Sequence, residues 1–258
     1  MHIGKVYIVG AGPGDPELIT VKGKRAIQEA DIIFYDRLIN DQLLAFAKPE
    51  TELVFCGKKP NYHAIRQETI NHLLVKHALK GKVVTRLKGG DPFIYGRGGE
   101  EAEYLSSNQI PFEIIPGITA GVAAPAYAGI PVTHRDYSSS FAVITGHQAS
   151  LQDFRWESLV NGIDTLVIYM GMKNLLNICR QLMKHGKNPN TSVALIQWGT
   201  TEKQRAVTGT LDTIVQKASS KNIKNPSIIV IGDVVKLSKK IGWFYPQVEN
   251  VNDIRFVR

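Results

Sequence analysis

A glycine-rich stretch in the first half of the chain combines flexible backbone with several ionisable side chains. Residues 87–101 (LKGGDPFIYGRGGEE) contain five glycines together with Asp91, Arg97, Glu100 and Glu101. Glycine lets a backbone approach a ligand closely, and charged groups can orient a substrate or move its protons. A plain turn would use the glycines and the Asp-Pro pair to reverse the chain, but it would not need four ionisable groups. The stretch therefore predicts an active-site loop.

The elements around this loop place it at the edge of a sheet. Residues 82–87 (KVVTRL) before it have the β-branched composition of a buried strand, and a helical pattern begins near Glu100. The loop should therefore follow the carboxyl end of a strand. In open α/β sheets that edge is where ligands bind.

Other predicted strands end on polar residues at the same edge. Asp36 and Arg37 follow residues 32–35, and Lys58 follows residues 52–55. An acid and an amine that meet across a cleft could accept and donate protons, because each shifts the pKa of the other. Turn residues in a surface ion pair would produce the same pattern, so the sequence leaves both interpretations open.

The first turn of the chain resembles a dinucleotide fingerprint but departs from it. Residues 10–15 (GAGPGD) follow an apolar strand, and Asp36 stands where a ribose-binding acid would be. The spacing is G-x-G-x-G, Pro13 removes an N–H that a phosphate would use, and Asp15 adds negative charge. A nicotinamide oxidoreductase is therefore disfavoured, whereas a ligand with a nucleoside and no phosphate remains compatible.

Strand and helix patterns alternate through the first half of the chain, which predicts a mainly parallel sheet. Strands are expected at residues 5–10, 32–35, 52–55, 82–87 and 112–115, and helices at residues 20–30, 63–79 and 118–128.

The second half should form a mixed sheet, because the short connection 199–205 suits an antiparallel hairpin. Its strands are expected at residues 141–145, 165–170, 192–197, 206–210 and 227–231, with helices at 175–185 and 211–218. The break in pattern at residues 129–140 suggests α/β domains at 1–133 and 134–245, followed by a tail at 246–258.

Composition describes an ordinary globular protein, with 258 residues, 43% hydrophobic and 21% charged. No apolar run reaches the roughly 18 residues of a membrane span, and the start lacks the pattern of a secretory signal. Cys56 and Cys179 lie far apart without metal-ligand spacing, so neither a disulfide nor a metal is expected. These features predict a cytoplasmic protein.

The net charge of +8 is concentrated in the second half. Residues 1–133 hold 15 basic and 14 acidic side chains, whereas residues 134–258 hold 16 and 9. A solvated basic face is the simplest explanation, and attraction to a polyanion, either nucleic acid or a substrate with many carboxylates, is the alternative.

Several motifs together resemble the tetrapyrrole methylase family, and within it the members that methylate uroporphyrinogen III. The resemblance extends over about residues 3–240, nearly the whole chain. The motifs are VGAGPGDPELIT (9–20), YDRL (35–38), GKK (57–59), RLKGGDPFIYGRGGEE (86–101), PGITA (116–120), GIPVTHRD (129–136) and YMG (169–171).

The resemblance implies two α/β domains with S-adenosylmethionine in the cleft between them, a homodimer, and no metal. A cofactor that has no phosphate and carries a sulfonium cation would explain the unusual first glycine loop. The residues implied to line the cofactor site are Pro13, Gly89, Gly90, Asp91, Ile94, Thr119, Ala120, Met170 and Gly199.

The implied reaction is transfer of two methyl groups to pyrrole carbons C2 and C7 of uroporphyrinogen III, giving precorrin-2 and S-adenosylhomocysteine. The resemblance assigns Asp36 as proton acceptor and Lys58 as proton donor, with Arg97 as an alternative essential residue. Arg97 is a poor base because it stays protonated, so an orienting role is favoured. Arg37, Glu100 and Arg135 are expected to bind the substrate, whose eight carboxylates suit arginine. The basic charge then needs no nucleic acid or membrane.

Rival hypotheses predict different features. A methylase of a later precorrin would keep the cofactor residues and change Asp36, Lys58 and Arg135. A ribosomal RNA ribose methyltransferase should place aromatic platforms among the late lysines of the second half. The sequence has no aromatic residue interleaved among Lys217, Lys221, Lys224, Lys236, Lys239 and Lys240. A non-catalytic S-adenosylmethionine sensor would bind the cofactor without turnover.

Overall fold

The chain folds into two compact units, each built on a five-stranded sheet. A computed structural model describes residues 2–57, 66–147 and 155–245, and its units are Met1–Ala123 and Ala124–Arg258. The division falls within helix α4 (Ala120–Tyr127). The boundary expected from sequence at 133/134 lies beyond that helix and stays a prediction.

The sheet of the first unit was predicted to be mainly parallel and is parallel throughout, with strand order β3-β2-β4-β1-β5. Parallel pairing brings the carboxyl ends of all these strands, and the loops that follow them, to one edge. The strands are β1 (Lys5–Gly10), β2 (Ile32–Tyr35), β3 (Glu52–Phe55), β4 (Val83–Lys88) and β5 (Phe112–Ile115).

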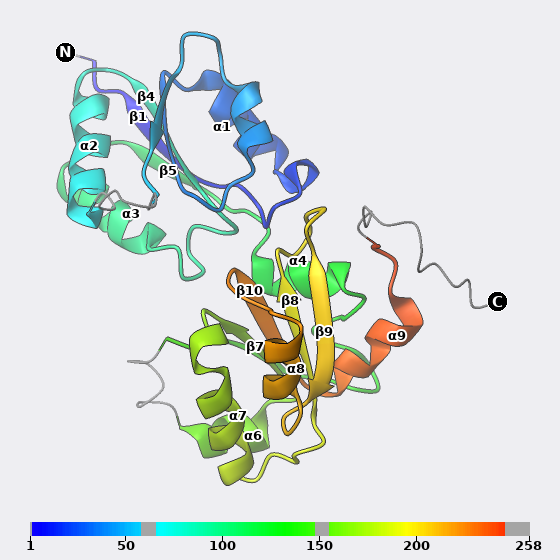
Figure 1. The fold of residues 1–258 in the computed structure, drawn as a ribbon. Helices are drawn as coiled ribbons and strands as arrows, with labels where there is room; N and C mark the ends of the chain where they lie inside the picture. Colours follow the sequence, from blue (N-terminus) through cyan, green and yellow to red (C-terminus); the bar gives the residue numbers. More distant parts are fainter. Residues whose placement is uncertain (1, 58–65, 148–154, 246–258) are drawn as a thin grey trace. The chain divides into compact units, whose positions relative to one another are not determined.

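Helices cover both faces of this sheet (Figure 1). One apolar cluster packs the sheet against α2 and α3, through residues such as Leu74 and Leu105. Another packs the opposite face against α1 and the 3-10 helix η2, through Ile27 and Leu43. The helical segments are η1 (Pro16–Leu18), α1 (Val21–Glu29), η2 (Asp41–Phe46), α2 (Gln67–Leu79) and α3 (Gly98–Ser107).

The sheet of the second unit is mixed, with order β6-β7-β10-β8-β9. Strands β6 and β7 are parallel, whereas β10 runs antiparallel to both β7 and β8. Strands β8 and β9 pair antiparallel, which confirms the predicted hairpin. The strands are β6 (Phe141–Thr145), β7 (Thr165–Tyr169), β8 (Ser192–Gln197), β9 (Arg205–Thr210) and β10 (Ser227–Ile231).

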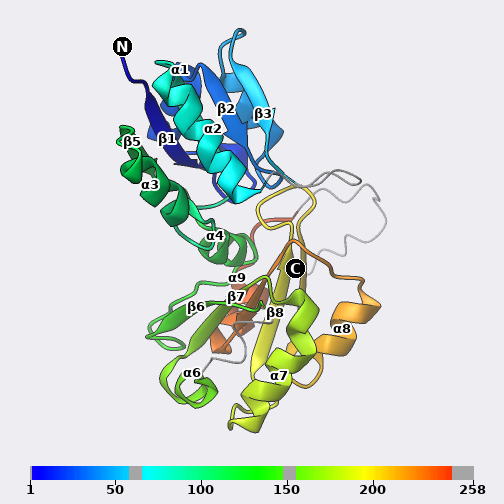
Figure 2. The ribbon, with the colours of Figure 1, turned by 90° about the vertical axis from the view of Figure 1, so that its left-hand side faces the viewer.

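A large apolar cluster of the second unit includes Trp156, Leu182 and Ile214 and lies between its sheet and the neighbouring helices (Figure 2). Several of the short helical segments were not predicted, because they offer too few turns for a periodic pattern. The unpredicted segments are α6 (Trp156–Gly162), η3 (Met172–Asn174), η4 (Asp233–Leu237) and α9 (Ser238–Ile241), whereas α7 (Leu175–Lys184) and α8 (Ile214–Ser220) correspond to the helices predicted at 175–185 and 211–218. No helix in the described ranges has both the length and the apolar character to cross a membrane.

Candidate functional site

Three loops at the carboxyl edge of the first sheet are packed backbone against backbone. Gly12 and Gly90 exchange hydrogen bonds, with N–O distances of 3.2 and 2.6 Å. A Cβ on Gly117 would lie 2.3 Å from the Gly90 carbonyl oxygen, and one on Gly10 would lie 2.5 Å from the Gly117 nitrogen. Any larger residue would force these loops apart, so the glycines form a cradle of closely packed main chain.

Asp91 links the loop after β4 to the loop after β5. Its Oδ2 accepts a hydrogen bond from the Gly117 N–H at 3.0 Å, and its Oδ1 accepts one from the Phe93 N–H at 2.8 Å. The carboxylate therefore brings negative charge to the glycine cradle and fixes the local turn. Its predicted contact with the cofactor stays a prediction.

The rest of this loop combines strained backbone with exposed apolar side chains. Tyr95 and Arg97 have positive φ values of 53° and 60°, which is uncommon for residues with a Cβ. Phe93, Ile94 and Tyr95 are 55%, 38% and 43% exposed. Strain of this kind clusters at ligand sites, and exposed apolar groups offer surface to a ligand.

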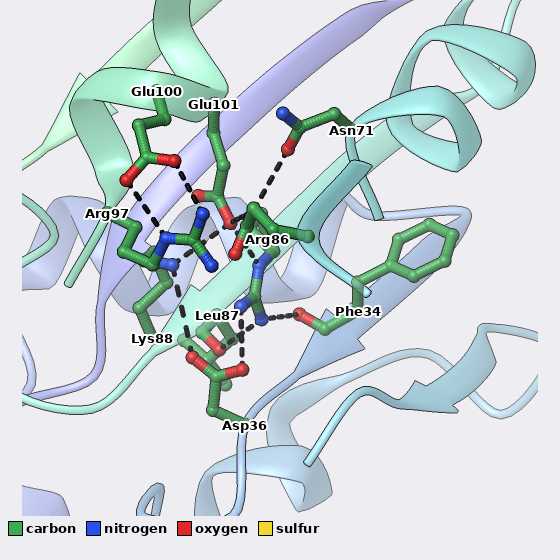
Figure 3. A network of polar contacts seen from close by, with 10 residues as sticks. Phe34, Asp36, Asn71, Arg86, Leu87, Lys88, Arg97, Glu100 and Glu101 are labelled. Atoms are coloured by element: carbon green, nitrogen blue, oxygen red, sulfur yellow. Dashed lines mark hydrogen bonds and ion pairs between the residues drawn. The ribbon is translucent and has the colours of Figure 1, made fainter. Parts of the chain in front are cut away.

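A network of charged side chains lies beneath this edge (Figure 3). Arg86 and Lys88 point to the same face of β4, since residues two apart in a strand share a face. From α3, the Glu101 Oε1 accepts hydrogen bonds from the Arg86 Nε at 2.9 Å and the Lys88 Nζ at 3.0 Å. Gln67 on α2 donates to the same oxygen at 2.9 Å. These contacts fasten two helices to the central strand.

Asp36, the predicted proton acceptor, completes this network from the end of β2. The Arg86 Nη2 donates to its Oδ1 at 2.6 Å, and the Lys88 Nζ lies 4.0 Å from its Oδ2. The Asp36 side chain is 31% exposed, whereas the side chains of Arg86, Lys88 and Glu101 are 3%, 3% and 0% exposed. Asp36 is thus the member of the network that solvent or a substrate can reach.

The electrostatics of the buried members follow from burial and pairing. Burial opposes ionisation of Glu101, but Arg86 and Lys88 outweigh it and hold the pKa of this carboxyl below its ordinary value. Burial, followed by repulsion from Arg86, lowers the pKa of Lys88. Burial also works against the Arg86 cation, but Asp36 and Glu101 more than compensate and raise its pKa. Nearby, burial raises the pKa of the Cys56 thiol to about 11, which makes it unreactive.

Arg97 and Glu100, both predicted site residues, pair with each other. The Arg97 Nε and Nη2 donate to the two Glu100 carboxylate oxygens at 2.9 and 2.6 Å. Their side chains are 52% and 53% exposed. The hydrogen bonds that Arg97 donates to Glu100 raise the pKa of Arg97, which makes it still less suited to act as a base.

The remaining predicted substrate-binding and catalytic residues are Arg37, Arg135 and Lys58, and they do not all lie in the first unit. Arg37 is exposed beside Asp36 in the first unit. Arg135 is exposed in the second unit, in a turn closed by hydrogen bonds between His134 and Ser138. Lys58, the predicted proton donor, lies outside the described residues.

The predicted cofactor residues come from both units. Pro13, Gly89, Gly90, Asp91, Ile94, Thr119 and Ala120 belong to the first unit, all of them in or beside the loops after β1, β4 and β5.

Met170 and Gly199 belong to the second unit and follow β7 and β8. Met170 has φ 53°, and Gly199 stands between Trp198 and Thr200, with φ 49° and 69°. A Cβ on Gly199 would lie 2.3 Å from the Ala124 Cβ. This concentration of unusual backbone marks the edge of the second sheet as a further candidate ligand surface.

The network that joins Arg86 and Lys88 to Glu101 was not predicted as part of the site. A signal was present, because two basic residues at alternate positions of an apolar strand need buried partners. Among the described residues, no group of three or more His, Cys, Asp and Glu side chains is placed to hold a metal ion.

Comparisons with known proteins agree with this geometry. Residues 5–215 match the family model of Tetrapyrrole (Corrin/Porphyrin) Methylases. Uroporphyrinogen-III C-methyltransferase of Priestia megaterium is 61% identical over 238 residues, covering 92% of this chain and all of the relative. Siroheme synthase of Nitrosospira multiformis is 47% identical over 95% of this chain, which spans 52% of that relative.

A solved structure has the same fold. The structure of uroporphyrin-III C-methyl transferase from Thermus thermophilus complexed with S-adenyl homocysteine matches with a TM-score of 0.77 and 36% identity, covering 91% of this chain and all of that one.

Proposed function

This chain belongs to the tetrapyrrole methylase family, and we propose that it transfers methyl groups from S-adenosylmethionine to C2 and C7 of uroporphyrinogen III, giving precorrin-2. The observation that carries this function is the 61% identity to a uroporphyrinogen-III C-methyltransferase over that relative's full length. Precorrin-2 would then feed siroheme or cobalamin-type products.

The residues of the first unit fit a cofactor of this kind. Gly10, Gly90 and Gly117 let the three loops pack main chain against main chain, and Pro13 leaves the first turn with one N–H fewer than a phosphate site would use. Asp91 offers a carboxylate to a positively charged ligand, and Ile94 offers apolar surface. We propose that these residues, with Gly89, Thr119, Ala120, Met170 and Gly199, hold S-adenosylmethionine, which supplies an electrophilic methyl group when bound.

The chain's own residues then position the substrate and remove a proton. We propose that Asp36, exposed at the end of β2, accepts the proton that leaves the pyrrole system after methyl transfer, with Lys58 as proton donor. Arg97, held by Glu100, orients the substrate or stabilises charge. Arg37 and Arg135 pair with substrate carboxylates, since guanidinium groups bind carboxylates in a bidentate way.

The wider setting follows from the same proposal. We propose a homodimer in the cytoplasm that acts on a free tetrapyrrole, without a metal, a nucleic acid or a membrane. The basic excess of the second half would attract a substrate with eight carboxylates.

Anaerobic incubation with enzymatically generated uroporphyrinogen III and S-adenosylmethionine tests the function, with mass analysis of the tetrapyrrole. The proposed function predicts a gain of two methyl groups. A protein that binds S-adenosylmethionine and leaves the substrate mass unchanged would contradict it and would favour a later precorrin or a sensor role.

A further inference from the structure

Four charged side chains form a closed ring beneath the carboxyl edge of the first sheet, here called the buried ring: Asp36, Arg86, Glu101 and Lys88 (Figure 3). Acids and bases alternate around it, so that each carboxylate faces both cations. Its two positive and two negative charges balance.

The buried ring is a costly way to hold a helix on a sheet. Removing charges from water carries a penalty that pairing recovers only in part, and well-packed apolar residues often stabilise a fold equally well. Three of the ring's side chains are at most 3% exposed, whereas the fourth, Asp36, is 31% exposed. A rigid support for that exposed carboxylate accounts for the arrangement better than stability does.

The ring treats the two oxygens of Asp36 differently. The Arg86 Nη2 donates to Oδ1 at 2.6 Å, a short charge-assisted hydrogen bond. Oδ2 has the Lys88 Nζ at 4.0 Å, beyond hydrogen-bonding distance. Oδ1 is therefore the anchored oxygen, and Oδ2, which accepts no hydrogen bond from the described residues, has a lone pair for a substrate proton.

We propose that Arg86, Lys88 and Glu101 are positioning residues that hold Asp36 with Oδ2 as its proton-accepting atom. The proposal rests on the proposed function. When the methyl group bonds to a pyrrole carbon, its bond to the sulfur of S-adenosylmethionine breaks and the electron pair of that bond stays on sulfur, which gives S-adenosylhomocysteine and leaves the tetrapyrrole positively charged. A proton then leaves that system and bonds to Oδ2, while the electron pair of the broken bond returns to the ring and neutralises it.

Glu101 is the member that best separates positioning from folding. Its Oε1 accepts from Arg86, Lys88 and Gln67, while its Oε2 is buried without a hydrogen-bond partner among the described residues. In Glu101→Gln the amide oxygen can still serve the three donors, and the NH2 group takes the place of Oε2. The variant therefore removes one charge from the ring without opening a cavity.

Glu113→Gln is the matched control. Glu113 lies on the edge strand β5 of the same unit and pairs with Lys5 and Lys22. For both variants and the wild type, kcat and KM for uroporphyrinogen III and the Kd for S-adenosylhomocysteine are measured. The proposal predicts that kcat of Glu101→Gln falls about 100-fold, the effect of misplacing a reacting group by about 1 Å. KM and Kd should stay within about twofold, because ground-state binding is not touched. Equal kcat in the two folded variants would overturn the proposal.

A substrate-free measurement keeps this test separate from that of the proposed function. The protein is labelled with 13C at the aspartate carboxyl carbons, and the Asp36 signal is identified by its loss in Asp36→Asn. The proposal predicts that Glu101→Gln displaces this signal and Glu113→Gln does not. If the wild type fails to methylate uroporphyrinogen III, the proposed function fails, and an unmoved Asp36 signal would independently overturn the positioning role.

Should Glu101→Gln not fold, Lys88→Met combined with Glu101→Gln removes one charge of each sign and is measured in the same way. The positioning role predicts the same loss of kcat and displaced signal in that double variant. A folded double variant with wild-type kcat and an unmoved signal would overturn it.

Discussion

The first unit holds two clusters of acids and bases that use the same side-chain chemistry in opposite surroundings. In the buried ring, Arg86, Lys88 and Glu101 are at most 3% exposed. In the second cluster, here called the edge triad, Glu113 on β5 pairs with Lys5 at 2.6 Å and with Lys22, and the three side chains are 28%, 39% and 62% exposed. The contacts are alike, but solvent reaches all three side chains of the edge triad, whereas in the buried ring it reaches only Asp36, which is 31% exposed.

This difference assigns different roles to the two clusters. Exposed ion pairs contribute about 0–1 kcal/mol because water competes for both partners, and their side chains stay free to move. Buried pairs cannot separate without leaving a charge in the interior. The buried ring can therefore fix the position of Asp36, whereas the edge triad can only add a small increment of stability to an edge strand.

The largest expected effect is on folding, from Arg86→Met. This change leaves the buried Glu101 with Lys88 as its remaining cation and Asp36 without its short hydrogen bond. We expect the free energy of unfolding, measured with urea, to fall by about 3–5 kcal/mol. Lys22→Met in the edge triad is the control, and equal losses in the two variants would contradict the contrast between the clusters.

A third pair, Arg97 with Glu100, sharpens the comparison because it is exposed and still part of the proposed site. Arg97→Lys should lower kcat/KM for uroporphyrinogen III by at least about 10-fold, since lysine cannot reproduce the planar bidentate fork. Its melting temperature should match that of the wild type. Loss of stability without loss of turnover would mean that this pair serves the fold instead.

The edge triad predicts a specific dependence on pH. Hydrogen bonds from Lys22 and Lys5 lower the pKa of Glu113 from 4.5 to about 2. Because the folded value is depressed, the stabilisation is present above pH 4.5 and is lost as the pH falls towards 2. Glu113→Gln should therefore cost less than about 1 kcal/mol at neutral pH, after allowance for screening by solvent.

Unfolding curves of wild type and Glu113→Gln between neutral and acidic pH would measure this difference. The two curves should converge as Glu113 becomes protonated. If the difference in free energy of unfolding between the two proteins widened towards acidic pH, the predicted direction of the pH dependence would be wrong.

The smallest expected effect is that of salt concentration on the stability differences between wild type and the variants. Raising NaCl from about 0.1 to 1 M shortens the screening length from about 10 to 3 Å, which weakens exposed pairs more than buried ones. The stability difference between wild type and Glu113→Gln should shrink with salt, while that between wild type and Arg86→Met should persist. Equal salt sensitivity of both differences would mean that the ring is open to solvent.

Much of the fold could be predicted because the strands carry strong local signals. The bounds of β1, β2, β3, β5, β6, β8 and β10 coincide with the predicted ranges, since β-branched runs between turn residues define them. The hairpin between β8 and β9 followed from the shortness of its connection. The short helices α6 and α9 have no such signal, because their positions depend on packing against the rest of the unit.

The sequence predicted which loops meet at the site, but it did not predict which side chains contact each other there. Glycine spacing and strand ends placed Asp36, Asp91 and Gly90 at one edge, and the structure brings their loops there. The buried ring depends on the register of β4 against β2, which pairs Arg86 with Phe34 shortly before Asp36, and on the packing of Glu101 from α3. Such contacts arise from tertiary structure and leave only an indirect trace in the sequence.

The most direct test of the central claim is the rate of methyl transfer by Asp36→Asn and by the wild type, under anaerobic conditions with saturating S-adenosylmethionine and uroporphyrinogen III. Asparagine is close in shape to aspartate but cannot take up the proton. The account predicts that Asp36→Asn binds S-adenosylhomocysteine normally and loses at least about 100-fold in kcat, as expected for a positioned acid-base group. A variant that adds both methyl groups at the wild-type rate would contradict it.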